Sequence, residues 1–274
     1  MKDILINKKH IIDIQLINKI ILIAKNAGKK IMQVYQTEFD VKLKEDLSPV
    51  TKADQLANEI ITKELNALDI KNPILSEEGR NIDYLDRKNW DMYWLVDPLD
   101  GTKEFIKRNG DFTVNIALIK GGEPKLGVVY APAKKLLFWG ANKLGSWSQK
   151  NGENAQQIKV SKGTSGKIKI GTSRSHNNEK INLFLSKLSD YELFTMGSSL
   201  KICRVADGSI HIYPRLGPTM EWDTAAAHAI LKSAGGDIID LETNSRMVYN
   251  KKNLLNNEFL AGNIKIINKL KVLT

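Results

Sequence analysis

Short apolar segments of strand length follow one another through the middle of the chain, and this run constrains the fold more than any other feature. Turn-rich connections separate them, such as Gly-Gly-Glu-Pro at 121–124. Connections this short join antiparallel strands, because a parallel crossover needs about a dozen residues or more. We therefore expect antiparallel hairpins in this region. The predicted strands are 92–96, 113–119, 126–130, 136–141 and 146–148.

Two amphipathic helices are predicted ahead of these strands. Apolar residues recur at spacings of three and four from Leu16 to Val34, which indicates a helix with one buried face. A second apolar stripe runs along 53–68, and Thr51 is its candidate N-cap.

The pattern changes after the polar segment 161–166. Strand-like and helix-like segments now alternate, as in a layered α/β unit. We predict an N-terminal α+β domain at 1–165 and a C-terminal α/β domain at 166–274. The alternating segments are 168–172 (strand), 181–188 (helix), 193–196 (strand) and a helix through Cys203.

Composition and charge narrow the class of protein. A chain of 274 residues with 42% hydrophobic content has the composition of a globular protein with a large core. The net charge is +10, but the lysines are scattered in ones and twos, which favours a solvated surface over a nucleic-acid platform. The single cysteine, Cys203, excludes an internal disulfide and a Cys-based zinc site.

The sequence also bears on location. Lysines interrupt the apolar stretch 11–35, so no uncharged run approaches the roughly 20 residues of a membrane span. No signal-peptide pattern appears at the start of the chain. We expect a cytoplasmic protein, and the sequence leaves peripheral association with the inner membrane open.

The most informative motif is Trp-Leu-Val-Asp-Pro-Leu-Asp-Gly-Thr at 94–102, where an apolar strand leads into a turn with two carboxylates. This spacing allows Asp97 and Asp100 to point toward a common centre, and Gly101 permits a ligand to approach closely. Two bare carboxylates about 4 Å apart repel by roughly 4 kcal/mol at an effective dielectric near 20. Convergence would therefore require a cation or a proton, and oxygen ligands favour Mg²⁺ or Mn²⁺.

Three further segments carry acidic residues. Ser-Glu-Glu-Gly at 76–79 follows the apolar residues 73–75 and places acid at another strand end, and Trp-Asp-Thr-Ala at 222–225 starts an alanine-rich helix. Thr-Lys-Ala-Asp at 51–54 completes the set. Each has a simpler explanation when taken alone. Glu77 and Glu78 fit an exposed acidic turn, Asp223 fits a helix N-terminus, and Asp54 fits a helix cap formed with Thr51. Thr102 alone would be a residue in the first turn of a helix. Their co-occurrence weakens these separate explanations.

These four segments, in this order, resemble the lithium-sensitive, Mg²⁺-dependent phosphatase family. That family includes inositol monophosphatase, fructose-1,6-bisphosphatase and the 3'(2'),5'-bisphosphate nucleotidases. The resemblance runs from about Asn26 to the helix at Asp223, and the stretches 93–119, 197–201 and 213–215 most resemble the bacterial nucleotidases. It implies a layered αβαβα sandwich with an antiparallel N-terminal sheet and a mixed C-terminal sheet.

The resemblance also implies roles for individual residues. Thr102 would orient the attacking water, with Asp54 accepting its proton through the hydroxyl, and backbone N–H groups of Gly101 and Thr102 would face the phosphate. Most of the metal ligands would lie in the N-terminal domain and hold two or three Mg²⁺ ions, with Mn²⁺ as an alternative. The implied ligands are Glu77, Asp97, the carbonyl oxygen of Leu99, Asp100 and Asp223, with Glu78 as a candidate beside them.

The implied substrate is a small phosphorylated nucleotide rather than a nucleic-acid polymer. The expected reaction is hydrolysis of the 3'-phosphate of adenosine 3',5'-bisphosphate to AMP and phosphate, with the sulfated relative also open. His176, Ser199 and Lys201 would lie near the nucleotide, and Arg215 near a phosphate. A solvated loop for His176 and a helix surface for Lys201 are the alternatives.

Other functions and assemblies stay open at this level. An inositol or other sugar phosphatase would use the same chemistry, and a basic nucleic-acid-binding protein would belong to a different class. The sequence does not decide the oligomeric state, with a homodimer among the alternatives.

Overall fold

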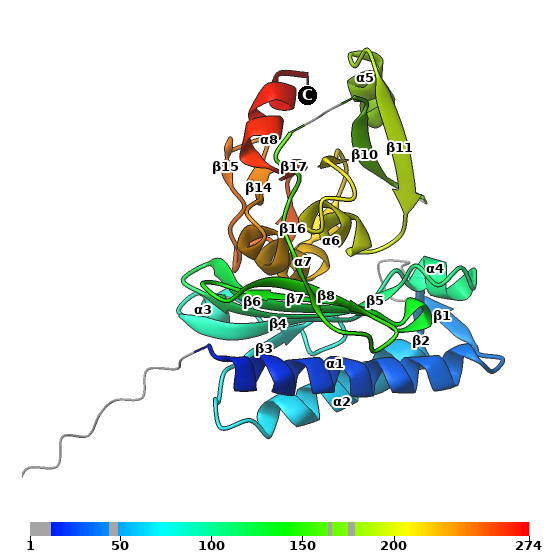
Figure 1. Cartoon of the computed structure of the whole chain (residues 1–274). Coiled ribbons are helices and arrows are strands. Elements are labelled where there is room, and N and C mark those ends of the chain that lie inside the picture. Colours follow the sequence, from blue (N-terminus) through cyan, green and yellow to red (C-terminus); the bar gives the residue numbers. More distant parts are fainter. Residues whose placement is uncertain (1–11, 44–48, 164–165, 175–178, 274) are drawn as a thin grey trace, which may run out of the picture.

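The computed structural model describes residues 12–43, 49–163, 166–174 and 179–273. These residues form five layers in which helices and sheets alternate (Figure 1). The outer helices α1 (Ile14–Tyr35) and α2 (Lys52–Asn66) cover one sheet, and α5 (Glu179–Ser186) and α8 (Ile264–Leu270) cover the other. Helices α6 (Leu200–Ala206) and α7 (Glu221–Ser233) lie between the two sheets. The predicted αβαβα sandwich is confirmed, and so are the two amphipathic N-terminal helices.

The first sheet has seven strands in the order β3-β4-β5-β6-β7-β8-β9. All neighbouring pairs are antiparallel except β3 and β4, which are parallel. The predicted hairpins are confirmed, and the strand end expected before Glu77 is the end of β3; the parallel pairing of β3 and the short β9 were not predicted. The strands are β3 (Ile74–Ser76), β4 (Met92–Asp100), β5 (Thr113–Lys120), β6 (Glu123–Ala131), β7 (Leu136–Ala141), β8 (Gly145–Lys150) and β9 (Gln156–Ile158).

Strand β4 differs from its prediction at its carboxyl end. The sequence predicted a strand at 92–96 followed by a turn, but β4 continues to Asp100. Its pairing with β5 shifts register between Asp97 and Asp100, which lie opposite Asn115 and Thr113. Pro98 falls within this irregularity, where the ladder does not need the N–H that proline lacks.

The second sheet has the order β11-β10-β12-β17-β14-β15 and is mixed, as predicted. Strand β10 is parallel to β11 and β12, and the other pairs are antiparallel. Two small antiparallel pairs, β1 with β2 and β13 with β16, lie outside the large sheets. The strands are β1 (Val41–Leu43), β2 (Pro49–Thr51), β10 (Ile168–Ser173), β11 (Tyr191–Met196), β12 (Ile212–Arg215), β13 (Thr219–Met220), β14 (Asp237–Asp240), β15 (Ser245–Arg246), β16 (Leu255–Asn256) and β17 (Phe259–Gly262).

Helix α7 packs directly on the first sheet because glycines on the sheet leave room for its backbone. A Cβ atom added at Gly127 would lie 2.0 Å from the carbonyl oxygen of Ala226. The alanine-rich sequence of α7 suits this close approach, since small side chains let the helix backbone come near the sheet. The contact fixes the start of α7, and with it Asp223, over the carboxyl end of β4.

The central hydrophobic core joins residues from both predicted domains. Cys203 is fully buried within it, together with residues of β4, β5, α7 and β17. Because this core includes residues from both sides of residue 165, it does not test the predicted division there, which remains a prediction.

The remaining short elements are α3 (Tyr84–Arg87), α4 (Thr102–Ile106), η1 (Pro132–Lys134) and η2 (Lys271–Leu273). Among the helices of the described ranges, none combines the length and the apolar character needed to cross a bilayer.

Candidate metal centre and active site

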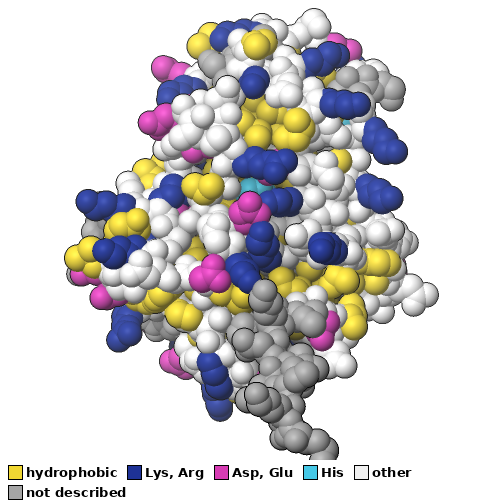
Figure 2. All heavy atoms as spheres, turned by 90° about the vertical axis from the view of Figure 1, so that its left-hand side faces the viewer, with side chains coloured by type: hydrophobic (Ala, Val, Ile, Leu, Met, Phe, Trp, Pro, Cys, Tyr) yellow, Lys and Arg dark blue, Asp and Glu magenta, His cyan; other side chains and the backbone are white. Residues whose placement is uncertain are grey.

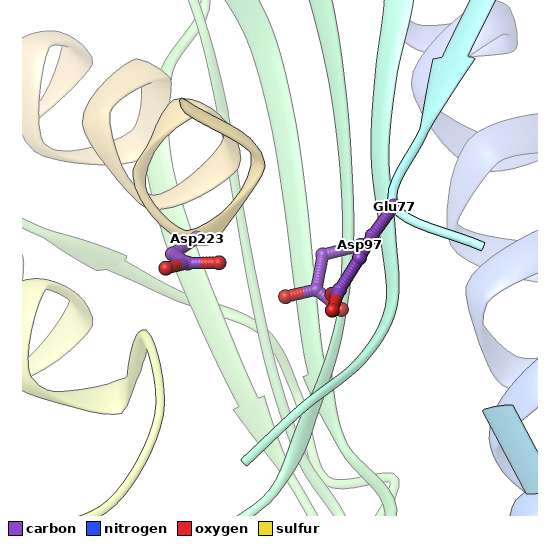
Figure 3. A group of neighbouring side chains, drawn as sticks. All are labelled: Glu77, Asp97 and Asp223. Carbon is purple, nitrogen blue, oxygen red and sulfur yellow. The ribbon is translucent and has the colours of Figure 1, made fainter. Parts of the chain in front are cut away.

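Three carboxylates from distant parts of the sequence come together between the first sheet and α7. Glu77 follows β3, Asp97 lies in β4 and Asp223 lies in the first turn of α7 (Figure 3). Each offers one oxygen, and these three oxygens all lie within 4.8 Å of one another. The parallel pairing of β3 with β4 places Glu77 beside Asp97. The backbone N–H of Glu77 continues this pairing by donating to the carbonyl of Val96 at 3.1 Å.

Asp100 is not a member of this tight group, but it lines the same cavity as Glu77 and Asp223. One of its oxygens, Oδ2, accepts a hydrogen bond from the backbone N–H of Ser199 at 2.5 Å. The bond joins the end of β4 to the start of α6 in the other half of the molecule.

The electrostatics of the group favour a bound cation. Burial, followed by the charges of Glu77 and Asp100, holds the pKa of Asp97 well above its usual range. Burial, followed by Asp100 and Glu77, does the same to the pKa of Asp223. Such shifts mean that negative charge is crowded here, and a divalent cation would relieve the crowding.

The donor atoms also fit a hard cation. Asp97 Oδ1 accepts the backbone N–H of Leu99 at 3.0 Å, while Oδ2 is buried and has no hydrogen-bond partner among the described residues. A buried carboxylate oxygen without a partner is costly unless a proton or an ion occupies its lone pairs. Because every candidate ligand is an oxygen, Mg²⁺, Mn²⁺ or Ca²⁺ suits the site better than zinc or copper.

Thr102 and Asp54 form a hydrogen-bonded pair beside the carboxylates. Thr102 Oγ1 donates to Asp54 Oδ1 at 3.1 Å. The other oxygen, Asp54 Oδ2, accepts from the backbone N–H and the hydroxyl of Thr51 at 2.8 and 2.7 Å. The predicted capping of α2 by Thr51 is confirmed, and Asp54 completes a capping box there. Burial raises the pKa of Asp54 despite these hydrogen bonds, so its affinity for a proton is increased.

Gly101 connects β4 to the short helix α4 and requires a left-handed backbone. Its φ of 92° is strained for any residue with a side chain, and an added Cβ would lie 3.0 Å from the carbonyl oxygen of Asp111. Leu99 is buried, and its carbonyl oxygen lies 3.4 Å from Thr102 Oγ1. Glu78 is half-buried and outside the group of three, and its backbone carbonyl accepts from Asn58.

The carboxylates line a cavity of about 440 Å³ that also contains basic residues. Lys201 is 5% exposed and donates to the carbonyls of Ser198 and Met196 at 2.7 and 3.3 Å, so it is not a helix-surface residue. Burial lowers its pKa to about 8. The lining residues with charged or hydroxyl side chains are Glu77, Asp100, Thr102, Lys103, Glu104, Ser173, Ser198, Ser199, Lys201, Tyr213, Arg215, Thr219, Asp223 and Thr224.

The predicted nucleotide contacts have different outcomes. Ser199 and Arg215 line the cavity together with Lys201. Arg215 donates to the carbonyl of Pro218 at 2.6 Å, and its Nε is buried with no hydrogen-bond partner within the described ranges. His176 lies outside the described residues.

A buried polar layer beneath the carboxylates was not predicted from the sequence. Ser199 Oγ donates to Asn115 Oδ1 at 2.7 Å and lies 2.9 Å from Thr113 Oγ1. Thr113 and Asn115 pair in register with Asp100 and Asp97. The available signal was two polar residues at alternate positions of an otherwise apolar strand, which place both side chains on one face.

Comparisons with known proteins identify the family of the chain. The inositol monophosphatase family model matches residues 14–271. The 3'(2'),5'-bisphosphate nucleotidase CysQ of Salmonella typhimurium is 45% identical over 227 residues, covering 82% of this chain and 90% of that protein. The Escherichia coli protein of the same name is 45% identical over 230 residues, with the same coverage.

Solved structures show the same fold. The crystal structure of CysQ from Bacteroides thetaiotaomicron, described as a bacterial member of the inositol monophosphatase family, superposes with a TM-score of 0.79 at 38% identity, covering 90% of this chain and 97% of that one. A Thermotoga maritima inositol monophosphatase superposes with a TM-score of 0.78 at 24% identity, covering 94% of this chain and 96% of that one. At this low identity, the Thermotoga maritima structure supports only the shared fold.

Proposed function

This chain belongs to the inositol monophosphatase family, and on that premise we propose that it is a Mg²⁺-dependent 3'(2'),5'-bisphosphate nucleotidase. The substrate is adenosine 3',5'-bisphosphate, whose 3'-phosphate is hydrolysed to give AMP and inorganic phosphate. The identity of 45% to two proteins of that name supports this choice of substrate. The observation that carries the chemistry is the convergence of Glu77, Asp97 and Asp223 beside the Thr102–Asp54 pair.

The proposed metal ligands are the four acidic side chains and one backbone oxygen. Asp97 Oδ2, buried and without a partner among the described residues, and the crowding of negative charge support this set. When bound, Mg²⁺ lowers the pKa of a coordinated water and neutralises charge on the phosphoryl oxygens. The ligands are Glu77, Asp97, the Leu99 carbonyl, Asp100 and Asp223.

The protein residues direct the proton of the attacking water. Because Thr102 Oγ1 donates its own hydrogen to Asp54 Oδ1, its lone pairs are left to accept a hydrogen bond from water. A proton leaving the water reaches Oγ1 while the threonine proton moves to Asp54 Oδ1. The raised proton affinity of Asp54 assists this transfer.

The displacement needs no covalent enzyme intermediate. The water oxygen bonds to phosphorus as the bond from phosphorus to the 3'-oxygen breaks, and the leaving oxygen takes a proton from solvent water to become the 3'-hydroxyl. Lys201, Arg215 and Ser199 are proposed to contact the rest of the nucleotide, because they line the same cavity.

A nucleotide rather than a nucleic-acid polymer is the proposed partner. On the face drawn in Figure 2, lysine and arginine side chains are spread over the surface with acidic side chains among them. On this face, acidic side chains therefore interrupt the basic ones, whereas a polymer backbone requires a continuous basic track.

A comparison of three substrates tests the proposal. Purified protein with Mg²⁺ is given adenosine 3',5'-bisphosphate, inositol 1-phosphate or fructose 1,6-bisphosphate, and phosphate release is measured. We expect the highest kcat/KM with the bisphosphate nucleotide. A preference for either of the other substrates would reject the nucleotide assignment and leave the phosphatase assignment intact. Phosphate release without metal would reject both the nucleotide assignment and the metal-dependent phosphatase.

A further inference from the structure

We propose that Asp111 is a positioning residue that holds the loop 197–199 against the metal ligand Asp100. The inference deepens the proposed function and rests on it for the metal-binding role of Asp100. Asp111 lies just before β5 and is 3% exposed. It touches neither the cavity nor the group of three carboxylates.

The carboxylate of Asp111 ties the two halves of the molecule together. Its Oδ1 lies 2.9 Å from Lys134 Nζ, which follows β6 in the first half of the chain. Its Oδ2 lies 3.0 Å from Arg174 Nη2, which follows β10 in the second sheet, and accepts the backbone N–H of Gly197 at 3.1 Å. One buried side chain thus anchors the end of β10 and the start of the loop 197–199.

The backbone of Asp111 also contacts both loops of the site. A Cβ atom added at Gly197 would lie 2.7 Å from the carbonyl oxygen of Asp111, and one added at Gly101 would lie 3.0 Å from the same atom. Gly101 follows Asp100 directly, and Gly197 opens the loop that reaches Ser199. Asp111 therefore lies in close contact with both segments, the one at Gly101 and the one at Gly197.

The loop needs such an anchor because its backbone is strained. Ser198 has a φ of 52°, a left-handed conformation that costs free energy in a residue with a side chain and persists only where the surroundings fix it. On one side of Ser198, Asp111 holds Gly197; on the other, the N–H of Ser199 donates to Asp100 Oδ2 at 2.5 Å. Without the anchor at Gly197, the loop can relax and the donor at Asp100 is lost.

Asp111 stays ionised near neutral pH. Burial alone would raise its pKa, but Lys134, the Gly197 N–H and Arg174 outweigh burial and hold the pKa below its usual value. A neutral side chain at this position would lose the attraction to both cations and would accept a weaker hydrogen bond from Gly197, because an ionised acceptor binds an N–H more strongly than a neutral one.

The alternative is that Asp111 serves only the stability of the fold. A matched control separates the two roles. Asp237 is an equally buried carboxylate, with a side chain 3% exposed against 4% for Asp111, and it pairs with Arg246 at 2.9 Å. It lies at the start of β14 and does not line the cavity.

The test compares Asp111→Asn with Asp237→Asn in the absence of substrate. Mg²⁺ binding is measured by titration calorimetry, and hydrogen–deuterium exchange of the amides of Gly197 and Ser199 is measured in metal-free protein. We expect Asp111→Asn to weaken Mg²⁺ binding about tenfold, the size typical of residues that orient a metal ligand, and to speed exchange at both amides. Asp237→Asn should lower Tm while leaving Mg²⁺ affinity and both amides unchanged.

Two results would overturn the inference: wild-type Mg²⁺ affinity and protection in Asp111→Asn, or an equal loss of affinity in both variants. If Asp111→Asn does not fold, the double variant Lys134→Met with Arg174→Met removes the partly exposed cations instead, and unchanged protection at Gly197 and Ser199 there would also overturn it. If the wild-type protein binds no Mg²⁺, the proposed function fails, and the exchange comparison still decides the role of Asp111.

Discussion

Thr102 Oγ1 lies 3.1 Å from Asp54 Oδ1, although the two residues are 48 positions apart in the sequence. The other oxygen of Asp54 accepts two hydrogen bonds from Thr51 at the start of α2. The two explanations that the sequence offered for Asp54, a helix cap and a partner of Thr102, are therefore compatible. The same carboxylate fixes a helix end with one oxygen and orients a hydroxyl with the other.

Removal of the Thr102 hydroxyl should affect turnover more than metal binding. We expect Thr102→Ala to lower kcat by about 10²- to 10³-fold, the usual size of a lost proton-transfer partner, with little change in Mg²⁺ affinity. Thr102→Ser keeps the hydroxyl and should retain most of the activity. Steady-state kinetics over a range of Mg²⁺ concentrations measure both quantities. A larger loss of Mg²⁺ affinity than of kcat would contradict the role of Thr102.

Neutralisation of Asp100 should stop the reaction and leave the fold intact. Asp100→Asn conserves volume and keeps an oxygen that can accept from Ser199, but it removes a charge from the proposed ligand set. We expect no measurable turnover at saturating Mg²⁺, with a circular dichroism spectrum and a Tm close to those of wild type. Near-normal activity would show that Asp100 is not a required ligand.

The pH dependence of stability without metal should reveal the crowded carboxylates. Burial and the charge of Glu77 raise the pKa of Asp97 in the folded protein above its unfolded value near 4. The folded state then binds more protons than the unfolded state, so the contribution of Asp97 is present at low pH and lost as pH rises through the folded pKa.

Urea denaturation in EDTA measures this effect by comparing wild type with Asp97→Asn. The free energy of unfolding of wild type should fall relative to that of the variant as pH rises from about 4, the unfolded value of an aspartate, through the raised pKa of folded Asp97. Saturating Mg²⁺ should reverse the order of the two proteins. A difference that is constant with pH would contradict the raised pKa.

The left-handed glycine at the end of β4 should tolerate no side chain. Gly101→Ala adds a backbone strain of about 1–2 kcal/mol and a contact at 3.0 Å with the Asp111 carbonyl. Gly152→Ala is the matched control, because Gly152 has a φ of 79° and no described atom within 4 Å of an added Cβ. We expect both variants to lose stability in urea and only Gly101→Ala to lose activity. Equal kcat/KM in the two variants would contradict the close fit at Gly101.

Much of the fold could be predicted from local pattern. Helix α1 and the hairpins of β5, β6 and β7 have long, regular apolar periods, and their bounds agree closely with the prediction. Strands β14 and β17 were not predicted, because each is only 4 residues long and is held mainly by pairing with distant strands. The extension of β4 to Asp100 depends in the same way on its pairing with β5.

The residues of the candidate site also fall into those that the sequence predicts and those that it does not. Glu77, Asp97 and Asp223 could be found because carboxylates at the ends of predicted elements carry a local signal, and the structure brings them together. The contacts of Asn115 and Asp111 with the loop before α6 could not be predicted, because they exist only after the two sheets assemble on α7. The position of a residue in the sequence does not reveal contacts that form only in the assembled protein.

The central claim is that separate carboxylates form a centre for divalent cations, and a crystal soaked in Mn²⁺ tests it most directly through anomalous scattering. We predict anomalous peaks within about 2.5 Å of carboxylate oxygens of Glu77, Asp97, Asp100 and Asp223, lost in crystals of Asp97→Asn. No peak at these oxygens under saturating Mn²⁺, or peaks only at other acidic residues, would contradict the account.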